Sequence, residues 1–243
     1  MNAGITFRIV LACCACATAA LAVADEALYQ PVDLRRAGEA DRRFYLSGIL
    51  GSSWGTLTVD EPPSVNEPLF TAGGAAGMAF ERESGRLRLE FEARYRDPIG
   101  ATFADADSST SLRAANGWST LVNLWRDVDL TDRFGVYLGG GIGGGGYGSS
   151  TISAAVPAAN FTINGGGSLG GFAWQAGGGA IYELTDRITL DLGYRFFAVD
   201  TGSITATSRQ AGVPIETLSF GSGFSASELL FTIRIYEPFR GWR

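Results

Sequence analysis

The chain has 243 residues and a formal net charge of −6, with 25 acidic residues against 19 basic ones, all of them arginine. This acidic balance argues against a nucleic-acid partner. The absence of histidine and lysine excludes a histidine-based catalytic triad or dyad and a lysine-assisted nucleophile. The 34 glycines are spread through apolar runs, which favours strands that pack closely against bulky side chains.

The N-terminal segment has the three-part pattern of a secretory signal peptide. Arg8 precedes an apolar stretch from 9 to 23, and small residues at 22–24 precede Asp25. We expect cleavage after Ala24, in preference to a short membrane anchor or a lipoprotein site at Cys13. All three cysteines lie in the removed segment, at Cys13, Cys14 and Cys16. The mature chain would then have no disulfide and no thiolate metal site.

Eight stretches alternate apolar and polar residues, which is the pattern of β-strands because successive side chains point to opposite faces. These predicted strands cover 44–54, 74–82, 87–96, 118–126, 134–142, 172–183, 188–197 and 227–236. The stretch 87–96, LRLEFEARYR, alternates apolar and charged residues without a break. Such a strand also fits the surface of a soluble sandwich, with its apolar face toward a dry core.

The hairpin at 172–197 separates the two interpretations. Its second strand carries Asp191 and Arg195 in its interior, opposite an apolar face that ends in aromatic residues. Charges at mid-strand fit a membrane barrel, which has lipid outside and a polar lumen inside. FAWQAG and YELTDRITLDLGYRFF in this hairpin resemble the sixth and seventh strands of small outer-membrane barrels of the outer-membrane protein A and opacity-protein type. The resemblance spans residues 44 to 236 and implies an all-β, eight-stranded antiparallel up-and-down transmembrane β-barrel.

The predicted connections alternate in length, as they do in outer-membrane barrels with short turns at one end and long loops at the other. The short ones are 83–86, 127–133 and 183–187, and the long ones are 56–72, 97–116, 144–169 and 199–225. The tetrapeptide LTDR occurs in two short connections, at 130–133 and 184–187. Relatives usually end on an aromatic residue that serves as an assembly signal. Here residues 237–243 follow, so Tyr236 or Phe239 must replace that terminus.

We therefore expect a signal peptide at 1–24, a periplasmic lead-in at 25–43 and an outer-membrane barrel at 44–243. The predicted location is the outer membrane of a Gram-negative bacterium. The expected partners are outer-membrane lipid and an unidentified extracellular ligand at the loops. We expect a monomer.

The inward-facing set carries a predicted network of charged residues. It consists of Glu81, Arg88, Glu90, Glu92, Arg94, Asp191, Arg195, Glu228 and Arg234. Five acids against four arginines predict ion pairs at two levels, because buried charges persist when they are paired. The upper level would pair Arg195 with Glu228 on the adjoining strand. Glycines on the same face, among them Gly77 and Gly193, would leave room in the lumen.

No motif indicates a cofactor or a metal. Residues 139–144 match a dinucleotide-binding glycine pattern, but no helix follows it. Residues 105–109 resemble the start of a calcium loop, but its twelfth position is Asn116 instead of glutamate. We therefore predict no cofactor, no metal site and no catalytic residues.

Three functions fit the sequence. The first is a non-enzymatic barrel with a structural or surface-exposed role and loops available for binding. The second is a narrow porin for small solutes. The third, a lipid-modifying enzyme, has the least support, since a Glu90–Glu92 carboxylate pair is better explained as a partner of the neighbouring arginines.

Overall fold

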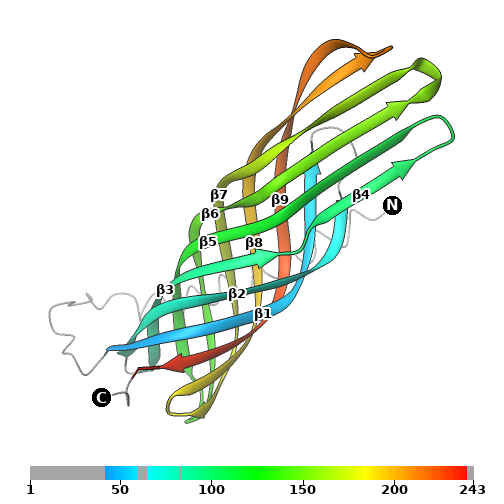
Figure 1. Cartoon of the computed structure of the whole chain (residues 1–243). Coiled ribbons are helices and arrows are strands. Elements are labelled where there is room, and N and C mark those ends of the chain that lie inside the picture. Colours follow the sequence, from blue (N-terminus) through cyan, green and yellow to red (C-terminus); the bar gives the residue numbers. More distant parts are fainter. Residues whose placement is uncertain (1–41, 60–64, 83, 240–243) are drawn as a thin grey trace, which may run out of the picture. The chain divides into compact units, whose positions relative to one another are not determined.

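The computed structural model describes residues 42–59, 65–82 and 84–239, and almost all of them are in strands (Figure 1). The strands are β1 Arg42–Val59, β2 Val65–Arg82, β3 Gly85–Arg96, β4 Ile99–Ala104, β5 Ser109–Asp129, β6 Phe134–Val156, β7 Phe161–Thr185, β8 Ile188–Gln210 and β9 Val213–Tyr236, with a short 3-10 helix, η2, at Pro157–Ala159. No helix among these residues is long and apolar enough to cross a membrane. The predicted signal peptide and most of the predicted lead-in lie outside the described residues.

The strands form one antiparallel sheet that closes on itself. Its order is β3-β2-β1-β9-β8-β7-β6-β5-β4, and β3 also pairs with β5. β3 and β4 keep one register against β5 and are separated only by Asp97 and Pro98, so they are two parts of a single strand. Counted in this way, the sheet is an eight-stranded up-and-down barrel, which confirms the predicted fold.

The two ends of the barrel differ. At the turn end, β2–β3, β5–β6 and β7–β8 are joined by short turns, and β1 begins and β9 ends there. The repeated LTDR tetrapeptide builds two of these turns. The Thr131 hydroxyl accepts a hydrogen bond from the Phe134 amide at 3.0 Å, and Thr185 does the same for Ile188 at 3.0 Å. The threonine therefore closes each turn with a local side-chain bond.

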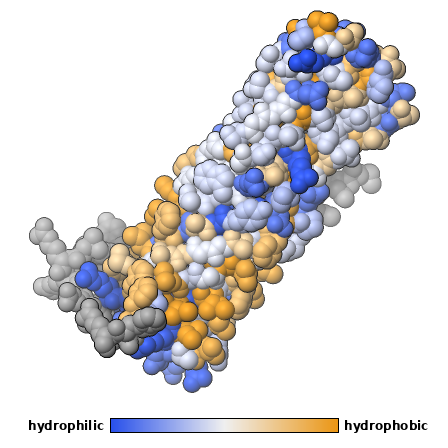
Figure 2. Space-filling view, in the orientation of Figure 1, coloured by the Kyte–Doolittle hydropathy of each residue, from blue (hydrophilic) through white to orange (hydrophobic). Residues whose placement is uncertain are grey.

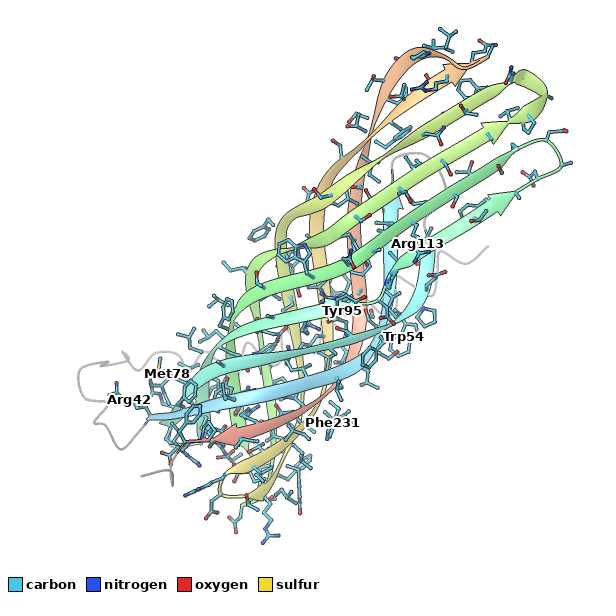
Figure 3. All side chains as sticks on the ribbon, viewed as in Figure 1. Arg42, Trp54, Met78, Tyr95, Arg113 and Phe231 are labelled. Carbon is cyan, nitrogen blue, oxygen red and sulfur yellow. The ribbon has the colours of Figure 1, made fainter. Side chains whose placement is uncertain are left out.

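The half of the barrel nearer the turn end carries an apolar band of exposed side chains on its outer face, and Figure 2 shows one side of this band. The predicted alternation holds here. Leu50, Val122 and Leu192 are more than half exposed, while their inward neighbours Ile49 and Asp191 are buried. Aromatic residues lie on the outer face at the edges of the band. Those at the turn end include Phe44, Phe134 and Tyr182, and those farther along the strands include Trp54, Phe70, Tyr95, Trp118 and Tyr194. Figure 3 labels Trp54 and Tyr95.

The sequence prediction of four long loops was wrong for most of the residues that the structure describes. Most described residues of these connections continue the strands as extended hairpins, which we call the hairpin half of the barrel. β7, for example, runs for 25 residues without interruption. The period-two pattern breaks where several strands enter this half, at Asp97–Pro98, at Asn116 with φ 58° and at the irregularities in β6 and β8. At the irregularities in β6 and β8 the register shifts by one residue, as at a bulge, and the following side chains turn to the other face.

After these breaks the polarity of the wall is reversed. The interior of the hairpin half is an apolar core that includes Leu57, Ile99, Leu112, Tyr147 and Phe224. The outer face there carries mostly small and polar residues, and Figure 2 shows the change in hydropathy along the wall. This half therefore has a dry core and a water-facing exterior, as a soluble barrel has.

The last strand ends as the proline at 238 predicts. Tyr236 is its final residue and lies in the lumen, where its ring packs edge-on against Tyr45 at 5.5 Å. Phe239 lies beyond the strand and is 69% exposed. Neither aromatic residue is therefore an outward-facing end of β9. The last outward-facing residue of β9 is Ile235.

Candidate functional site

The lumen of the turn-end half contains a continuous network of buried charges. Among the described residues, five carboxylates and six arginines are at least nine-tenths buried. They are Glu90, Glu92, Asp127, Asp191, Glu228, Arg86, Arg88, Arg94, Arg96, Arg195 and Arg234. β3 alone contributes six of them, because every second residue from Arg86 to Arg96 points inward.

The level nearest the turn end joins two ion pairs. The Arg88 Nε atom lies 2.9 Å from both carboxylate oxygens of Asp127, and Arg234 pairs closely with Asp191. Arg234 is also 3.8 Å from Asp127, so the two pairs form one group. Still closer to the turn end, at the mouth of the barrel, Arg86 pairs closely with Glu183 and lies 3.7 Å from Glu81. The side chain of Glu81 is 40% exposed, so it belongs to the mouth of the barrel.

Glu90 is held mainly by neutral donors. Its carboxylate accepts hydrogen bonds from the hydroxyl of Tyr45 at 3.0 Å, the indole of Trp125 at 3.1 Å and the amide of Asn123 at 3.2 Å. Arg88 is 3.8 Å away. This set of donors satisfies the carboxylate from several strands at once.

Glu92 occupies the centre of the network. One of its oxygens lies 2.5 Å from Arg94 and the other 2.5 Å from Arg195. Arg195 also lies over the ring of Trp125, with the guanidinium 4.6 Å from the ring centre. A cation on an aromatic face gains further electrostatic stabilisation when water is excluded.

Glu228 closes the network toward the hairpin half. It accepts hydrogen bonds from Arg94 at 2.5 Å and from Arg96 at 2.9 Å. The Arg96 guanidinium stacks on Phe197, 3.9 Å from the ring centre, and Phe197 belongs to the apolar core. The polar and apolar parts of the lumen thus meet at this arginine.

The predicted Arg195–Glu228 pair is wrong. The two residues are neighbours in the β8–β9 ladder, but each pairs with a residue of β3 instead. Being partners in the β-ladder does not decide which side chains form an ion pair, because an arginine side chain is long enough to cross a narrow lumen. The network also ends near the middle of the barrel, since the strands continue beyond Glu228 as the hairpin half.

Three buried charges were missed in the sequence. Asp127 was assigned to a turn, although it continues the inward period of Asn123 and Trp125, and it pairs with Arg88. Arg86 was also assigned to a turn, and Arg96 was left out of the inward set, although both share the inward face of β3 with Arg94. The alternation itself was the signal for all three. Glu81 was placed inside, and the structure puts it at the mouth.

The inner-face glycines do not leave empty space. The Tyr137 ring fills the room beside Gly193, where an added Cβ would overlap the hydroxyl. The Tyr45 ring does the same at Gly77, where a Cβ would lie 2.6 Å from it. Glycine is required at these positions because an aromatic side chain from another strand approaches the backbone closely.

The arrangement therefore holds charges in pairs and presents little that could react. Each buried carboxylate accepts a hydrogen bond from at least one arginine, amide, indole or phenol. Within the described part of the chain, no three histidine, cysteine or acidic residues come together in a way that could hold a metal ion.

The chain is similar to several solved structures of outer-membrane and surface proteins. Neisserial surface protein A is 16% identical, with 79% of this chain and 96% of that chain covered and a TM-score of 0.37. The attachment invasion locus protein Ail of Yersinia pestis is 11% identical over 79% and 98%, with a TM-score of 0.38. The outer membrane protein OprG of Pseudomonas aeruginosa is 10% identical over 80% and 96%, with a TM-score of 0.40.

A search of the curated proteins found no match. The family model described as "Outer membrane protein beta-barrel domain" matches residues 9–216, which is most of the chain. With the closed antiparallel barrel and its outward apolar band, this match shows that the chain belongs to the outer membrane protein beta-barrel domain family.

Proposed function

We propose that this protein is a non-enzymatic barrel of the outer membrane whose lumen is closed and whose hairpin half carries its surface-exposed role. One observation supports this proposal most strongly. Paired charges fill the lumen of the turn-end half, and an apolar core fills the hairpin half. Eight strands enclose an interior only just wide enough for side chains to fill. In this proposal the protein is monomeric and the hairpins are available to an extracellular ligand.

The composition supports a non-enzymatic role. The chain has no histidine, and the buried carboxylates are engaged by arginines and neutral donors. A general base must reach a substrate proton, and these carboxylates are sealed inside the barrel. Hydrolytic assays on phospholipids and peptides should give no turnover above that of the buffer.

The proposal fixes the orientation in the membrane. Peptide tags inserted near 106, 158 and 212 should be labelled on intact cells, because these positions lie at the ends of hairpins. A tag at 186, in the β7–β8 turn, should be labelled only after the outer membrane is opened. External labelling at 186 would contradict this orientation.

Conductance tests the closed lumen. Purified protein in planar bilayers should show little or no steady conductance, because paired charges fill the lumen of one half and an apolar core fills the other. Arg195→Ala should lower the stability of the barrel more than it raises conductance, since it leaves Glu92 with one fewer buried partner. A large, stable conductance of the wild-type protein would instead favour a narrow porin.

A further inference from the structure

The outer face of the hairpin half carries a row of side chains that are able to donate and accept hydrogen bonds. Six residues on six consecutive strands, β4 to β9, are ladder partners in turn: Thr102, Ser111, Ser153, Asn164, Thr207 and Thr217. Their sequence neighbours Leu112, Ile152 and Ala206 are buried in the apolar core, so the row faces outward. Adjacent strands in a sheet lie about 4.8 Å apart, which sets the spacing of the row.

A second row lies next to the first, on the side of the turn end, and it contains a cation. Gly100, Arg113, Thr151 and Gly166 are ladder partners across β4 to β7. Arg113 is exposed, and Figure 3 shows it on the outside of the wall beyond Tyr95. The face therefore combines many hydroxyl groups with a guanidinium.

The wall has a seam where the two rows reach β4. The β2–β3 ladder ends with the Asp97 amide donating to the Phe70 carbonyl at 3.0 Å. The next hydrogen-bonded pair in this register would join Pro68 to Ile99, but proline has no N–H to donate. Beyond it the described residues of β2 and β4 form no ladder. The Glu67 carboxylate bridges the seam and accepts a hydrogen bond from the Gly100 amide at 3.4 Å.

A groove of about 360 Å³ lies along this seam. It is lined by Glu67, residues 98–102 and residues 111–113. Its polar groups are the carboxylate of Glu67, the guanidinium of Arg113 and the hydroxyls of Thr102 and Ser111, which lie 3.2 Å apart. Its apolar part comes from Pro98 and the side of β4. A groove of this size and mixed chemistry fits one or two sugar rings.

The position of the groove identifies the source of the sugar. Tyr95 and Trp118 are ladder partners on the outer face, a few residues before the seam on the same strands. Aromatic residues of this kind mark the membrane interface in outer-membrane barrels. The lining of the groove begins at Pro98, shortly after Tyr95 on the same strand, so the groove lies at the height of the lipid headgroups, away from the hairpin tips.

We propose that this groove and the adjoining hydroxyl rows bind the phosphorylated saccharide headgroup of a glycolipid in the same outer leaflet. Sugar hydroxyls both donate and accept hydrogen bonds, as serine and threonine do. The Glu67 carboxylate accepts from sugar hydroxyls, and Arg113 binds a phosphate group, for which a guanidinium is well suited.

The test uses the full-length folded protein in phospholipid nanodiscs, with rough lipopolysaccharide, consisting of lipid A and inner-core sugars, as the probe. Retained glycolipid is measured by native mass spectrometry, and stability by thermal unfolding. Wild-type protein should retain the glycolipid and unfold at a higher temperature in its presence.

Arg113→Gln should weaken binding about tenfold, as expected for one lost charge-assisted contact. Thr102→Val combined with Ser111→Ala should also weaken it. Arg133→Gln, an exposed arginine at the turn end, is the matched control and should bind as wild type does.

Two results would overturn the proposal. One is equal retention by wild type, Arg113→Gln and the Thr102/Ser111 double variant. The other is equally tight binding of the delipidated core oligosaccharide, which would assign the groove to a soluble saccharide. If Arg113→Gln does not fold, the double variant decides, because it removes only outward-facing hydroxyls. Conductance of the barrel has no bearing on this outcome, so the closed-lumen proposal is tested separately.

Discussion

Replacing Glu92 by glutamine should lower the free energy of unfolding by about 3–5 kcal/mol, the range measured when one partner of a buried ion pair is removed. Glu92 is 1% exposed and lies 2.5 Å from both Arg94 and Arg195. The glutamine keeps the shape and one acceptor oxygen, but it leaves two buried guanidinium groups with less negative charge nearby. Urea unfolding of the reconstituted barrel, followed by gel mobility and tryptophan fluorescence, measures the change.

The matched control is Glu81→Gln, the same substitution at the mouth. Glu81 is 40% exposed on its side chain and lies 3.7 Å from Arg86, so water screens the pair. Exposed pairs contribute about 0–1 kcal/mol. If Glu92→Gln and Glu81→Gln destabilise the barrel equally, the central network does not hold the lumen together in the way the contacts indicate.

The turn-end half could be predicted from the sequence because each of its strands has one face toward lipid and the other toward a polar lumen. Lipid selects apolar side chains at one parity, and a narrow polar lumen selects charges at the other. The stretch from Leu87 to Arg94 therefore indicated both the strand and the face of each residue in it. The same rule would have placed Arg86, Arg96 and Asp127 in the lumen if the period had been followed to the ends of the strands.

The pairing inside the lumen could not be read in the same way. A ladder register places Arg195 beside Glu228, but the guanidinium lies against Glu92, which comes from β3. The choice depends on strand tilt and on which rings occupy the space between, such as Trp125 beneath Arg195. Both depend on the closed barrel as a whole and cannot be derived from two neighbouring strands alone.

The strands of the hairpin half were not predicted from the sequence, because the alternation of apolar and polar residues shifts by one position where several strands enter it. Ile99 and Leu112 face inward, whereas the apolar residues of the same strands in the band face outward. The residues at the breaks between the two halves, including Asn116 and the Asp97–Pro98 step, resemble loop sequence. Small residues on the outer face weaken the contrast further. A search that allowed one phase shift per strand would have found these hairpins.

The same reversal gives the last prediction, which compares two outward positions on β8. Leu192 is 54% exposed within the apolar band, and Thr205 is exposed on the hairpin half. Leu192→Arg should destabilise the barrel in bilayers by about 2–4 kcal/mol, as arginine does near the membrane midplane. Thr205→Arg should cost less than about 0.5 kcal/mol, because a surface substitution in water has little effect. Both are measured by urea unfolding in the same lipid. Equal losses would mean that the bilayer extends over the hairpin half. If instead neither variant loses stability, the apolar band does not face lipid, because the cost at Leu192 arises only from moving a charge into hydrocarbon.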